Sequence, residues 1–379
     1  MDLELNEEQR MIQEMARNFA EKEVAPVAAH LDESHEFPVD LTKQMGELGL
    51  MGVAVPEEYG GAGMDYICYV VALEEICAAC ANTGVVMSAN NSLACGPVLA
   101  NGTHEQKEKF LAPMAAGEKI GCFGLTEPSA GSDAANQKTT AVLKGDEWLI
   151  NGNKIFITNA TDADIAVIFA VTDKEKKHRG ISAFIVEKGT PGFSIGKVEK
   201  KLGLNASGTA ELVFEDCRIP KDQLLGELGA GFKIALQTLD GGRIGIAAQA
   251  VGIARAAMEQ SAKYALEREQ FGQPIAKFQA IQWMLADMAT EIDAARLLTY
   301  RAAYLQSAKQ RYSQESAMAK LFASETAMKT ATKAVQIHGG YGYTKDYVVE
   351  RLFRDAKITE IYEGTSEVMR MVISGGLLS

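Results

Sequence analysis

The sequence Trp-Leu-Ile-Asn-Gly-Asn-Lys-Ile-Phe-Ile-Thr at residues 148–158 decides the fold class. Two runs of branched and aromatic residues, 148–151 and 154–158, flank Asn151-Gly152-Asn153, which is the pattern of two strands joined by a turn. No helix of useful length separates these strands from their neighbours, so residues 118–226 are predicted to form an antiparallel β-barrel or sandwich domain. The other strands of this domain are predicted at 120–125, 139–143, 164–172, 181–187 and 211–219.

The chain before this region has helical periodicity. Asn6 precedes a segment whose apolar residues recur every three or four positions, as expected for a capped amphipathic helix. Segments of the same character follow at 39–50, 66–81 and 105–111. Residues 1–117 are therefore predicted to form an all-α domain.

The chain after the β region returns to helical periodicity, in longer segments. They are predicted at 230–267, 275–307, 313–338 and 345–378. Helices of this length are typical of a bundle, so residues 227–379 are predicted to form a four-helix bundle. The predicted fold class is thus a multidomain α+β protein with a helical, a β and a second helical domain.

The charge of the 379-residue chain is acidic, with 38 Lys and Arg against 50 Asp and Glu and a formal net charge of −12. Nucleic acids and anionic membranes require a basic surface, so neither is expected as the main partner. The longest stretch without Asp, Glu, Lys or Arg, 76–103, contains several Asn and Ser residues and a Pro, which hydrocarbon cannot accommodate. We expect two buried helices there, in a core or lining a cavity, with a turn near 82–84.

The N-terminus, Met-Asp-Leu-Glu-Leu-Asn-Glu-Glu, has neither the apolar run of a signal peptide nor the Arg-rich character of a transit peptide. The expected location is the cytoplasm, or an organelle for a mature form that has lost its transit peptide. Cys77 and Cys80 form a CxxC pair without a second pair or a nearby His, so two buried thiols are expected instead of a zinc or redox site. No metal is expected, since the five histidines are scattered and form no HExxH motif.

Two segments of the predicted β domain could face a ligand. Residues 126–133, Thr-Glu-Pro-Ser-Ala-Gly-Ser-Asp, form a polar turn whose N–H groups and hydroxyls suit an anion, although an ordinary strand connection explains them as well. Phe156 and Thr158 lie two apart on a predicted strand, hence on one face. The ring could stack on a flat group and the hydroxyl could reach a ring nitrogen, while a half-buried core strand is the simpler interpretation.

Glycines beside charged residues mark three places in the predicted bundle. Asp240-Gly241-Gly242-Arg243 opens a predicted helix and offers a guanidinium to a phosphate or to a charged partner. Arg268-Glu269-Gln270-Phe271-Gly272 ends a helix, where the helix dipole alone favours a cation. Residues 336–342 end another helix with three glycines, which permit the close approach of a backbone, most often that of the next helix.

Residues 361–367, Ile-Tyr-Glu-Gly-Thr-Ser-Glu, carry the strongest candidate for catalysis. Glu363 lies between Tyr and Gly, just before a Thr/Ser helix cap and in an apolar surround. Loss of hydration raises the pKa of such a carboxyl toward that of a general base.

Taken in order, these segments resemble the acyl-CoA dehydrogenase family over essentially the whole chain. The resemblance implies the same three-domain fold, one FAD bound in each subunit, and a homotetramer built as a dimer of dimers. The motifs that match are Leu125-Thr126-Glu127-Pro128 with Gly131-Ser132-Asp133, Asp240 to Arg243, Gln336 to Gly340, Arg354-Asp355-Ala356-Lys357-Ile358 and Ile361 to Thr365.

The resemblance also implies the chemistry and the site. Glu363 would take the α-proton of an acyl thioester while the β-hydrogen leaves as hydride to flavin N5. The backbone N–H of Glu363 and a flavin ribityl hydroxyl would bind the thioester carbonyl. Positions that match contacts to the flavin and its pyrophosphate are Phe123, Leu125, Thr126, Gly131, Ser132, Phe156, Ile157 and Thr158, and Thr365 and Glu367 match contacts on the adenosine and pyrophosphate side. Positions that match contacts to the FAD of a neighbouring subunit are Arg268, Phe271, Phe278, Gln279, Gln336, Gly339 and Gly340. Positions that match substrate contacts are Ser132, Asp240, Arg243, Tyr362 and Gly364.

Within the family, the short-chain or butyryl-type members are most similar, because 239–245 and Phe156 in place of Trp are typical of them. Asp240 keeps a dehydrogenase of branched or cyclic acyl-CoA open. A nitroalkane-oxidase-like enzyme would use Asp as its base and a non-catalytic flavin carrier could lack a base, so Glu363 disfavours both. The resemblance implies electron-transferring flavoprotein as the partner and a role in fatty acid β-oxidation.

Overall fold

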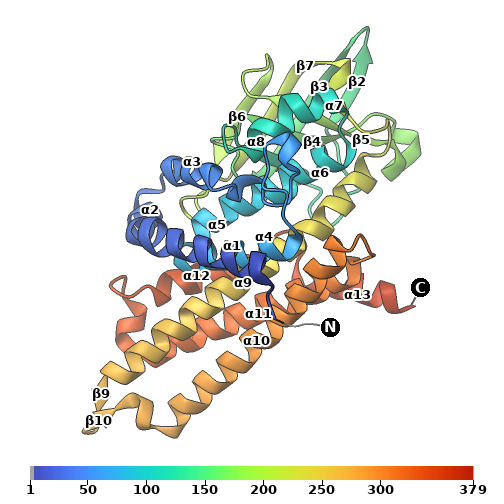
Figure 1. Ribbon diagram of the computed structural model, residues 1–379. Helices are drawn as coiled ribbons and strands as arrows, with labels where there is room; N and C mark the ends of the chain where they lie inside the picture. The colour runs from blue at the N-terminus through green and yellow to red at the C-terminus, as the bar shows by residue number, and fades with distance from the viewer. Residues whose placement is uncertain (1–3, 379) are drawn as a thin grey trace.

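The computed structural model describes residues 4–378 and contains three parts that follow one another along the chain (Figure 1). The N-terminal helices, blue to cyan in Figure 1, lie between a β-sheet at one end of the molecule and a set of long helices at the other. This arrangement of helical, β and helical parts confirms the predicted fold class.

The N-terminal helices begin as the sequence predicts. The side chain of Asn6 accepts the N–H of Gln9 at 2.8 Å, and the side chain of Gln9 accepts the N–H of Asn6 at 3.0 Å, which completes a capping box. The helices are α1 (Glu7–Phe19), α2 (Ala28–Ser34), α3 (Val39–Glu47), α4 (Tyr66–Ala79), α5 (Ala81–Ser88), α6 (Gly96–Asn101), α7 (His104–Gln106) and α8 (Ala112–Ala115), with a π-helical stretch at Ala89–Cys95.

The predicted turn near residues 82–84 is wrong. The helix breaks earlier, at Cys80, where φ is −155°, and α5 continues through Asn82. The buried Asn82 does not need a turn, because its side-chain oxygen accepts the backbone N–H of Ala206 at 2.8 Å. Among the described residues, no helix combines the length and apolar content needed to cross a membrane.

The middle of the chain forms one eight-stranded sheet, in the order β6-β7-β3-β2-β4-β5-β8 with β1 paired to β4. Most pairs are antiparallel as predicted, but β1 runs parallel to β4, so the purely antiparallel prediction is wrong. β2 also pairs in parallel with β4, at Thr140 and Val171. The strands are β1 (Gly121–Gly124), β2 (Thr140–Lys144), β3 (Glu147–Ile157), β4 (Ile165–Val171), β5 (Ile181–Glu187), β6 (Phe193–Val198), β7 (Ala210–Pro220) and β8 (Leu224–Leu225).

The Asn-Gly-Asn step at residues 151–153 does not form a turn, because β3 is a single strand through it. The pairing of β3 with β7 shifts register between Ile150 and Gly152, so the step is a bulge. Asn151 exchanges two hydrogen bonds with Asp216 of β7, at 2.8 and 3.2 Å. Gly152 is required there, since its φ is +141° and a Cβ would come within 2.5 Å of the Thr139 hydroxyl.

The C-terminal helices pack around α9, the longest helix, which also contacts α4. The helix predicted at 345–378 is divided into two, because the chain leaves the helical conformation between residues 360 and 365. The Asp240 to Arg243 motif lies inside α9 and does not open it, since the helix begins at Gly231. The elements are α9 (Gly231–Glu267), β9 (Glu269–Gln270), β10 (Gln273–Pro274), α10 (Gln279–Ser307), α11 (Ser313–His338), α12 (Val349–Thr359) and α13 (Ser366–Leu378).

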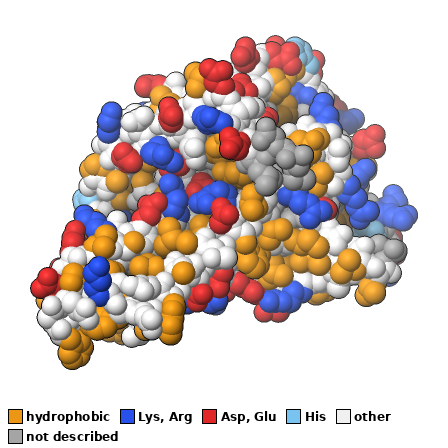
Figure 2. Space-filling view, turned by 60° about the horizontal axis from the view of Figure 1, so that its bottom comes forward, with side chains coloured by type: hydrophobic (Ala, Val, Ile, Leu, Met, Phe, Trp, Pro, Cys, Tyr) orange, Lys and Arg blue, Asp and Glu red, His pale blue; other side chains and the backbone are white. Residues whose placement is uncertain are grey.

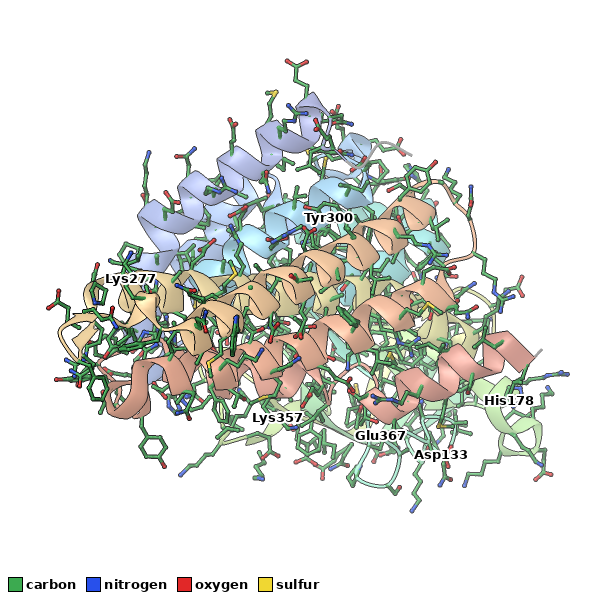
Figure 3. The ribbon with its side chains drawn as sticks, turned by 90° about the horizontal axis from the view of Figure 1, so that it is seen from below. Asp133, His178, Lys277, Tyr300, Lys357 and Glu367 are labelled. Carbon is green, nitrogen blue, oxygen red and sulfur yellow. The ribbon has the colours of Figure 1, made fainter. Side chains whose placement is uncertain are left out.

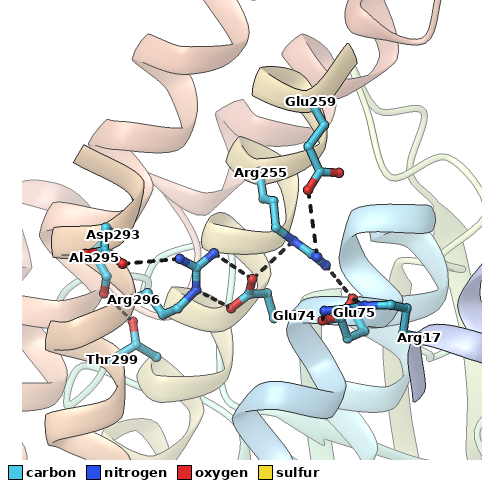
Figure 4. Close-up of polar contacts among 9 residues, drawn as sticks. All are labelled: Arg17, Glu74, Glu75, Arg255, Glu259, Asp293, Ala295, Arg296 and Thr299. Carbon is cyan, nitrogen blue, oxygen red and sulfur yellow. Dashed lines mark hydrogen bonds and ion pairs between the residues drawn. The ribbon is translucent and has the colours of Figure 1, made fainter. Parts of the chain in front are cut away.

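A buried ionic network ties the first helices to the bundle (Figure 4). Glu74 and Glu75 of α4 are each 3% exposed. Arg17 of α1 makes two hydrogen bonds to Glu75, and Arg296 of α10 makes two to Glu74. Arg255 of α9 bridges both carboxylates, at 3.2 and 2.7 Å. Both carboxylate oxygens of Glu74 and of Glu75 therefore have a cationic partner, as buried acids require.

All six cysteines are free and buried, including Cys77 and Cys80 of the CxxC pair. The interpretation of this pair as buried structural thiols is confirmed.

Candidate active site

Glu363 lies in the short connection between α12 and α13. The hydroxyl of Thr365 accepts the N–H of Val368 at 3.3 Å, so the predicted Thr cap of α13 is present. Backbone φ is +54° at Glu363 and +105° at Gly364. A positive φ is unfavourable for glutamate, so contacts from elsewhere must hold this connection.

Two buried cations hold its backbone. Nε of Arg243, on α9, donates to the carbonyl oxygen of Glu363 at 3.3 Å. Nζ of Lys320, on α11, donates to the carbonyl oxygen of Gly364 at 2.7 Å. Lys320 is fully buried and Arg243 is 5% exposed. Consecutive carbonyls of the connection are thus anchored to two different helices.

The carboxyl group of Glu363 is buried, and its Oε2 has no hydrogen-bond partner among the described residues. Burial raises the pKa of Glu363 to about 7, although the positive charges of Arg243 and Lys320 act to lower it. The predicted rise in pKa is confirmed. Gly242 makes room for the carboxylate, because a Cβ there would lie 2.1 Å from Oε2. A carboxyl group with a free oxygen that titrates near neutral pH can remove a proton from carbon.

Asp240 lies three residues before Arg243 on α9, and the two form an ion pair of 2.7 Å. The second carboxylate oxygen of Asp240 accepts the hydroxyl of Ser313. Since both oxygens are occupied, Asp240 is disfavoured as the base. The guanidinium of Arg243 bonds to Asp240 and to the Glu363 backbone, and a contact between Arg243 and substrate stays a prediction.

A cavity of about 660 Å³ lies beside α9. The hydroxyl of Tyr66 in its wall donates to the carbonyl of Gly241 at 3.3 Å, and the charge of Glu363 acts on both Tyr66 and Tyr69. Tyr66 and Tyr69 therefore line the cavity and also lie within electrostatic reach of Glu363, which is not itself one of the lining residues. The uncharged segment lines it, as expected, with residues that include Asn91, Ser92, Pro97 and Leu99, and the remaining wall includes Asp240, Arg311 and Tyr312.

The face of α9 that carries Gly242 changes from small to large side chains along the helix. A Cβ at Gly245 would lie 2.6 Å from the hydroxyl of Tyr69. One turn further, Gln249 is fully buried and its side-chain oxygen accepts the hydroxyl of Tyr362. Gln249 lies roughly 10 Å along the helix axis from Gly242. The hydrogen-bonded side chains of Gln249 and Tyr362 therefore fill the space along this face of α9 beyond Glu363.

The positions matched to flavin contacts in the β domain come together where β1 and β3 end. The N–H of Ile155 donates to the carbonyl of Thr126 at 2.8 Å, which places the turn after β1 beside the end of β3. Phe156 is 61% exposed, and Thr126 and Thr158 are partly exposed. Gly131 and Ser132 are exposed in the turn.

The prediction that Phe156 and Thr158 share a strand face is wrong. Phe156 has a φ of +58°, and the pairing of β3 shifts register between Lys154 and Ile157, so the alternation of side chains is interrupted. The side chain of Ile157 belongs to the core of the sheet. The side chains of Leu125 and Phe123 also pack into a core, Phe123 with its ring 5.0 Å from that of Phe169. The side chains of Ile157 and Leu125 are therefore buried and do not face a ligand.

A second buried lysine lies under the turn at residues 126–133. Nζ of Lys154 contacts Oε1 of Glu127 at 2.7 Å, Oε1 of Gln137 at 3.0 Å and the carbonyl of Leu125 at 3.4 Å. Glu127 also accepts the backbone N–H groups of Lys138 and Thr139. This network determines the path of the chain on both sides of the turn.

The positions matched to a neighbouring FAD lie at the far end of the bundle. A cavity of about 560 Å³ there is lined by residues that include Arg268, Gly339, Gly340 and Tyr341. Phe271 is 94% exposed and contacts Phe278 edge to face at 6.1 Å, and Gln279 and Gln336 are exposed. Figure 3 labels Lys277 at this end of the bundle and Asp133 and Glu367 toward the other. One chain therefore does not bring the two sets together, as Figure 1 also shows from the place of β9 and β10.

The residues of both sets fit FAD in the chemistry they offer. Phe156 presents an exposed ring to a flat group, and the hydroxyls of Thr126, Ser132 and Thr158 can bond to ring atoms or phosphate. A Cβ at Gly131, Gly339 or Gly340 would meet nothing within 4 Å, so each backbone is open to a ligand. Arg268 adds a cation suited to a phosphate.

Three residues near Glu363 and the turn were missed by sequence reasoning. Lys320 occupies a helix face otherwise made of Ala and Ser, and this isolated charge is the signal that could have identified it. Gln249 is likewise the one polar side chain in the apolar stretch at 244–254 of α9. Lys154 gave no signal, because a strand lysine usually faces solvent. The spacing GxSxG occurs at Gly192–Gly196, but Ser194 lies on β6 and not at a strand-to-helix turn.

Comparison with known proteins places this chain in a family. The family models described as acyl-CoA dehydrogenase N-terminal, middle and C-terminal domain match residues 6–118, 122–217 and 229–378. The short-chain specific acyl-CoA dehydrogenase of Clostridium acetobutylicum is 56% identical over 375 residues, 99% of either chain. The mitochondrial short-chain specific enzyme of Rattus norvegicus is 55% identical over 376 residues, 99% of this chain and 91% of the relative.

Two solved structures have nearly the same backbone. Butyryl-CoA dehydrogenase from Megasphaera elsdenii has a TM-score of 0.98 at 48% identity, over all of both chains. A chain of the structure described as the electron transferring flavoprotein of Acidaminococcus fermentans has a TM-score of 0.99 at 57% identity, also over all of both chains.

Proposed function

The chain belongs to the acyl-CoA dehydrogenase family, and from that premise we propose that Glu363 is the base that starts the conversion of a short-chain acyl-CoA to its trans-2-enoyl-CoA. The enzyme is a flavin-dependent oxidoreductase. Bound FAD supplies the acceptor for the hydrogen that leaves the β-carbon as hydride. The observation that carries the proposal is the buried, unpartnered Oε2 of Glu363 in a connection held by two cations.

The α-hydrogen of a thioester is weakly acidic, so an ordinary carboxylate removes it poorly. Glu363, with a pKa of about 7, is a stronger base and is still partly ionised at neutral pH. Within residues 4–378, the backbone N–H of Glu363 donates no hydrogen bond. This N–H group is therefore free to polarise the thioester carbonyl, which stabilises the negative charge that develops as the α-proton moves to Oε2.

The closed face of α9 supports a short acyl chain. Gly242 lets Glu363 lie against α9, Gly245 lets Tyr69 and Ser88 do the same, and the pair of Gln249 and Tyr362 fills the space beyond. A longer chain would have to displace a buried amide that is hydrogen-bonded to a phenol, which is unfavourable. The names of the two relatives and of the M. elsdenii enzyme, short-chain specific and butyryl-CoA dehydrogenase, agree with this assignment.

A second copy of the chain would complete the cofactor site. The two sets of cofactor positions lie at opposite ends of the molecule, so a partner subunit has to supply one of them. Figure 2 shows apolar side chains gathered on the bundle side of the molecule. Trp283, Tyr304, Phe322 and Met371 of α10, α11 and α13 are among the large apolar residues that are exposed. We propose a homotetramer, in which this surface is covered, and electron-transferring flavoprotein as the electron acceptor, as the likeness to the A. fermentans structure suggests.

The location that we propose is the cytoplasm, or the inside of an organelle for a mature form. The relatives support either choice, since one is bacterial and the rat enzyme is named as mitochondrial.

Anaerobic reduction of the purified yellow protein tests the proposed function. Butyryl-CoA should bleach the flavin absorbance quickly, octanoyl-CoA and isovaleryl-CoA more slowly, and Glu363→Gln should bind butyryl-CoA without bleaching. If isovaleryl-CoA alone bleached the flavin quickly, the substrate would be a branched acyl-CoA instead of a straight short-chain one. A yellow protein that no acyl-CoA bleaches would contradict the proposal.

A further inference from the structure

Lys320 is a fully buried ammonium group next to the candidate base. It lies on α11 among buried residues that include Ala317, Ala319, Ala323 and Ser324. Its Nζ donates to the carbonyl oxygen of Gly364 at 2.7 Å. In the described chain, no carboxylate lies within ion-pair distance of this Nζ, whereas Lys154 contacts Glu127 directly. A buried charge without a contacting counterion is costly and calls for an explanation.

The charged groups around Lys320 identify its counterion. Glu363, Arg243, Glu360 and Glu367 are the groups whose charges act on it, in that order of strength. Glu367 is exposed and Glu360 forms an ion pair with Lys357, so water and Lys357 screen both. The buried carboxyl of Glu363 is therefore the main negative charge that balances Lys320.

Arg243 also lies beside Glu363 but is already neutralised in part. It forms an ion pair with Asp240 at 2.7 Å, with both groups largely buried. The other titratable groups facing Glu363 are the phenols of Tyr66, Tyr69 and Tyr362, which are neutral at physiological pH. Burial lowers the pKa of Lys320 to about 8, so at pH 7 its ammonium group is mostly charged and adds to the effect of Arg243, which acts more strongly on Glu363.

We propose that Lys320 is a positioning residue that anchors the Gly364 carbonyl and supplies the buried positive charge that keeps Glu363 ionised before the proton transfer. This inference rests on the proposed function, because it assumes that Glu363 is the base. After the transfer Glu363 is neutral and the ammonium has lost its counterion. Lys320 therefore also favours release of the proton from Glu363 once the product has left.

Three substitutions of Lys320 separate the anchor from the charge. Lys320→Met removes both, Lys320→Gln keeps a donor for the Gly364 carbonyl without the charge, and Lys320→Arg keeps the charge. Lys329→Met is the matched control, since Lys329 lies on the same helix, is half exposed and pairs with Glu291 at the surface.

Two measurements on the FAD-containing protein test the proposal. The first is the rate of anaerobic bleaching by butyryl-CoA from pH 6 to pH 10. The second is an infrared titration, without substrate, of the protonated carboxyl band that Glu363→Gln lacks. Lys320→Met and Lys320→Gln should raise both midpoints by about 1 to 2 pH units, the effect of losing a charge at close range. The bleaching rate at pH 7 should then fall by roughly five- to fiftyfold and recover at high pH. Lys320→Arg and Lys329→Met should keep the wild-type midpoints.

An equal loss of rate at every pH, with an unchanged infrared midpoint, would show that Lys320 has only a structural role and would overturn the proposal. If Lys320→Met does not fold, a comparison of the midpoints of Lys320→Gln and Lys320→Arg shows whether the charge of Lys320 matters. Failure of the proposed function is distinguishable, because it would appear as normal bleaching by Glu363→Gln, whatever Lys320 does.

Discussion

Two regions of this molecule bury a lysine with a glutamate and use the pair in opposite ways. Under the turn at 126–133, Nζ of Lys154 contacts the carboxylate of Glu127 directly at 2.7 Å. Next to α13, Nζ of Lys320 contacts a backbone carbonyl at 2.7 Å and leaves Oε2 of Glu363 without a partner. Lys154 and Glu127 thus form a direct ion pair, called here the closed pair. Glu363 keeps a carboxylate oxygen without a partner and is called here the open glutamate.

The protonation of the two glutamates follows from this difference. Burial acts to raise the pKa of Glu127, but Lys154 and the hydrogen bonds to its carboxylate outweigh burial, and the pKa lies below its ordinary value. At Glu363, burial outweighs the more indirect effects of Arg243 and Lys320, and the pKa rises to about 7. Whether a buried cation contacts the carboxylate or the backbone beside it decides between a structural acid and a base.

Replacement of the open glutamate should have the largest effect. Glu363→Gln removes the atom that accepts the proton, so the rate of anaerobic bleaching by butyryl-CoA should fall by about 10³- to 10⁴-fold. Binding of butyryl-CoA, measured by calorimetry, should persist. The matched control is Glu325→Gln, which changes an exposed acid that pairs with Arg370 and should leave the rate unchanged. A fall of less than tenfold in Glu363→Gln would mean that another group is the base.

Disruption of the closed pair should act on stability. Lys154→Met leaves the buried charge of Glu127 without its cation and should lower the free energy of unfolding by about 3 to 5 kcal/mol. Denaturant titration would measure it, with the exposed Lys144→Met of β2 as control. The folded, FAD-containing fraction should keep the wild-type pH profile of bleaching, unlike Lys320→Met. If Lys154→Met were as stable as the wild type, Lys154 would not be the counterion that stabilises the buried Glu127.

The open glutamate should itself lower stability at alkaline pH. Its pKa is about 7 in the folded chain and near its ordinary 4.5 in the unfolded chain, so the folded state binds more protons between these values. Stability is therefore lost as pH rises through this window, by up to about 3 kcal/mol above pH 7. Glu363→Gln should be more stable than wild type at pH 8 and similar at pH 4.5. A variant that is less stable at pH 8 would contradict this sign.

The space around the open glutamate can be tested at Gly242. Gly242→Ala places a Cβ 2.1 Å from Oε2, so the carboxyl must move. Overpacking of this kind lowers stability by about 1 to 3 kcal/mol, and the bleaching rate should fall because the base is displaced. Gly375→Ala is the control, since a Cβ there meets nothing within 4 Å. Normal bleaching by Gly242→Ala would show that the base has more room than the structure gives it.

The sequence predicted the open site better than the closed pair. Glu363 stands out in the sequence because its motif combines a carboxylate, a Gly and a helix cap over seven residues, while its role as the base follows from the family resemblance and stays a proposal. The helix–sheet–helix order was likewise identifiable, since it depends on local periodicity. Lys154 and Glu127 are distant in sequence, and nothing local indicates that strand β3 places the lysine under the turn.

The errors have a common physical cause. Asn151-Gly152-Asn153 has the local composition of a turn, but the bulge it forms depends on Asp216 of the neighbouring strand. The direction of β1 depends on which strand it pairs with, and the break between α12 and α13 on cations from α9 and α11. Each of these features is set by contacts between distant parts of the chain, which local patterns do not record.

The smallest predicted effect concerns the acyl pocket. It distinguishes the residues that set the substrate preference from the residue that acts as the base. Gln249→Ala removes the side chain that closes the α9 face, so the preference for butyryl-CoA over octanoyl-CoA should fall by roughly tenfold, the effect of one or two methylenes in an apolar pocket. The pH midpoint of bleaching should stay the same. Competition between the two thioesters measures the preference, and an unchanged ratio would show that the chain end lies elsewhere.

An infrared titration of the protonated carboxyl band, in wild type, Glu363→Gln and Glu127→Gln, tests the central contrast most directly. We expect a component with a midpoint of about pH 7 that is absent in Glu363→Gln and present in Glu127→Gln. The contrast would be contradicted if that component disappeared in Glu127→Gln, or if Glu363 titrated near its ordinary 4.5.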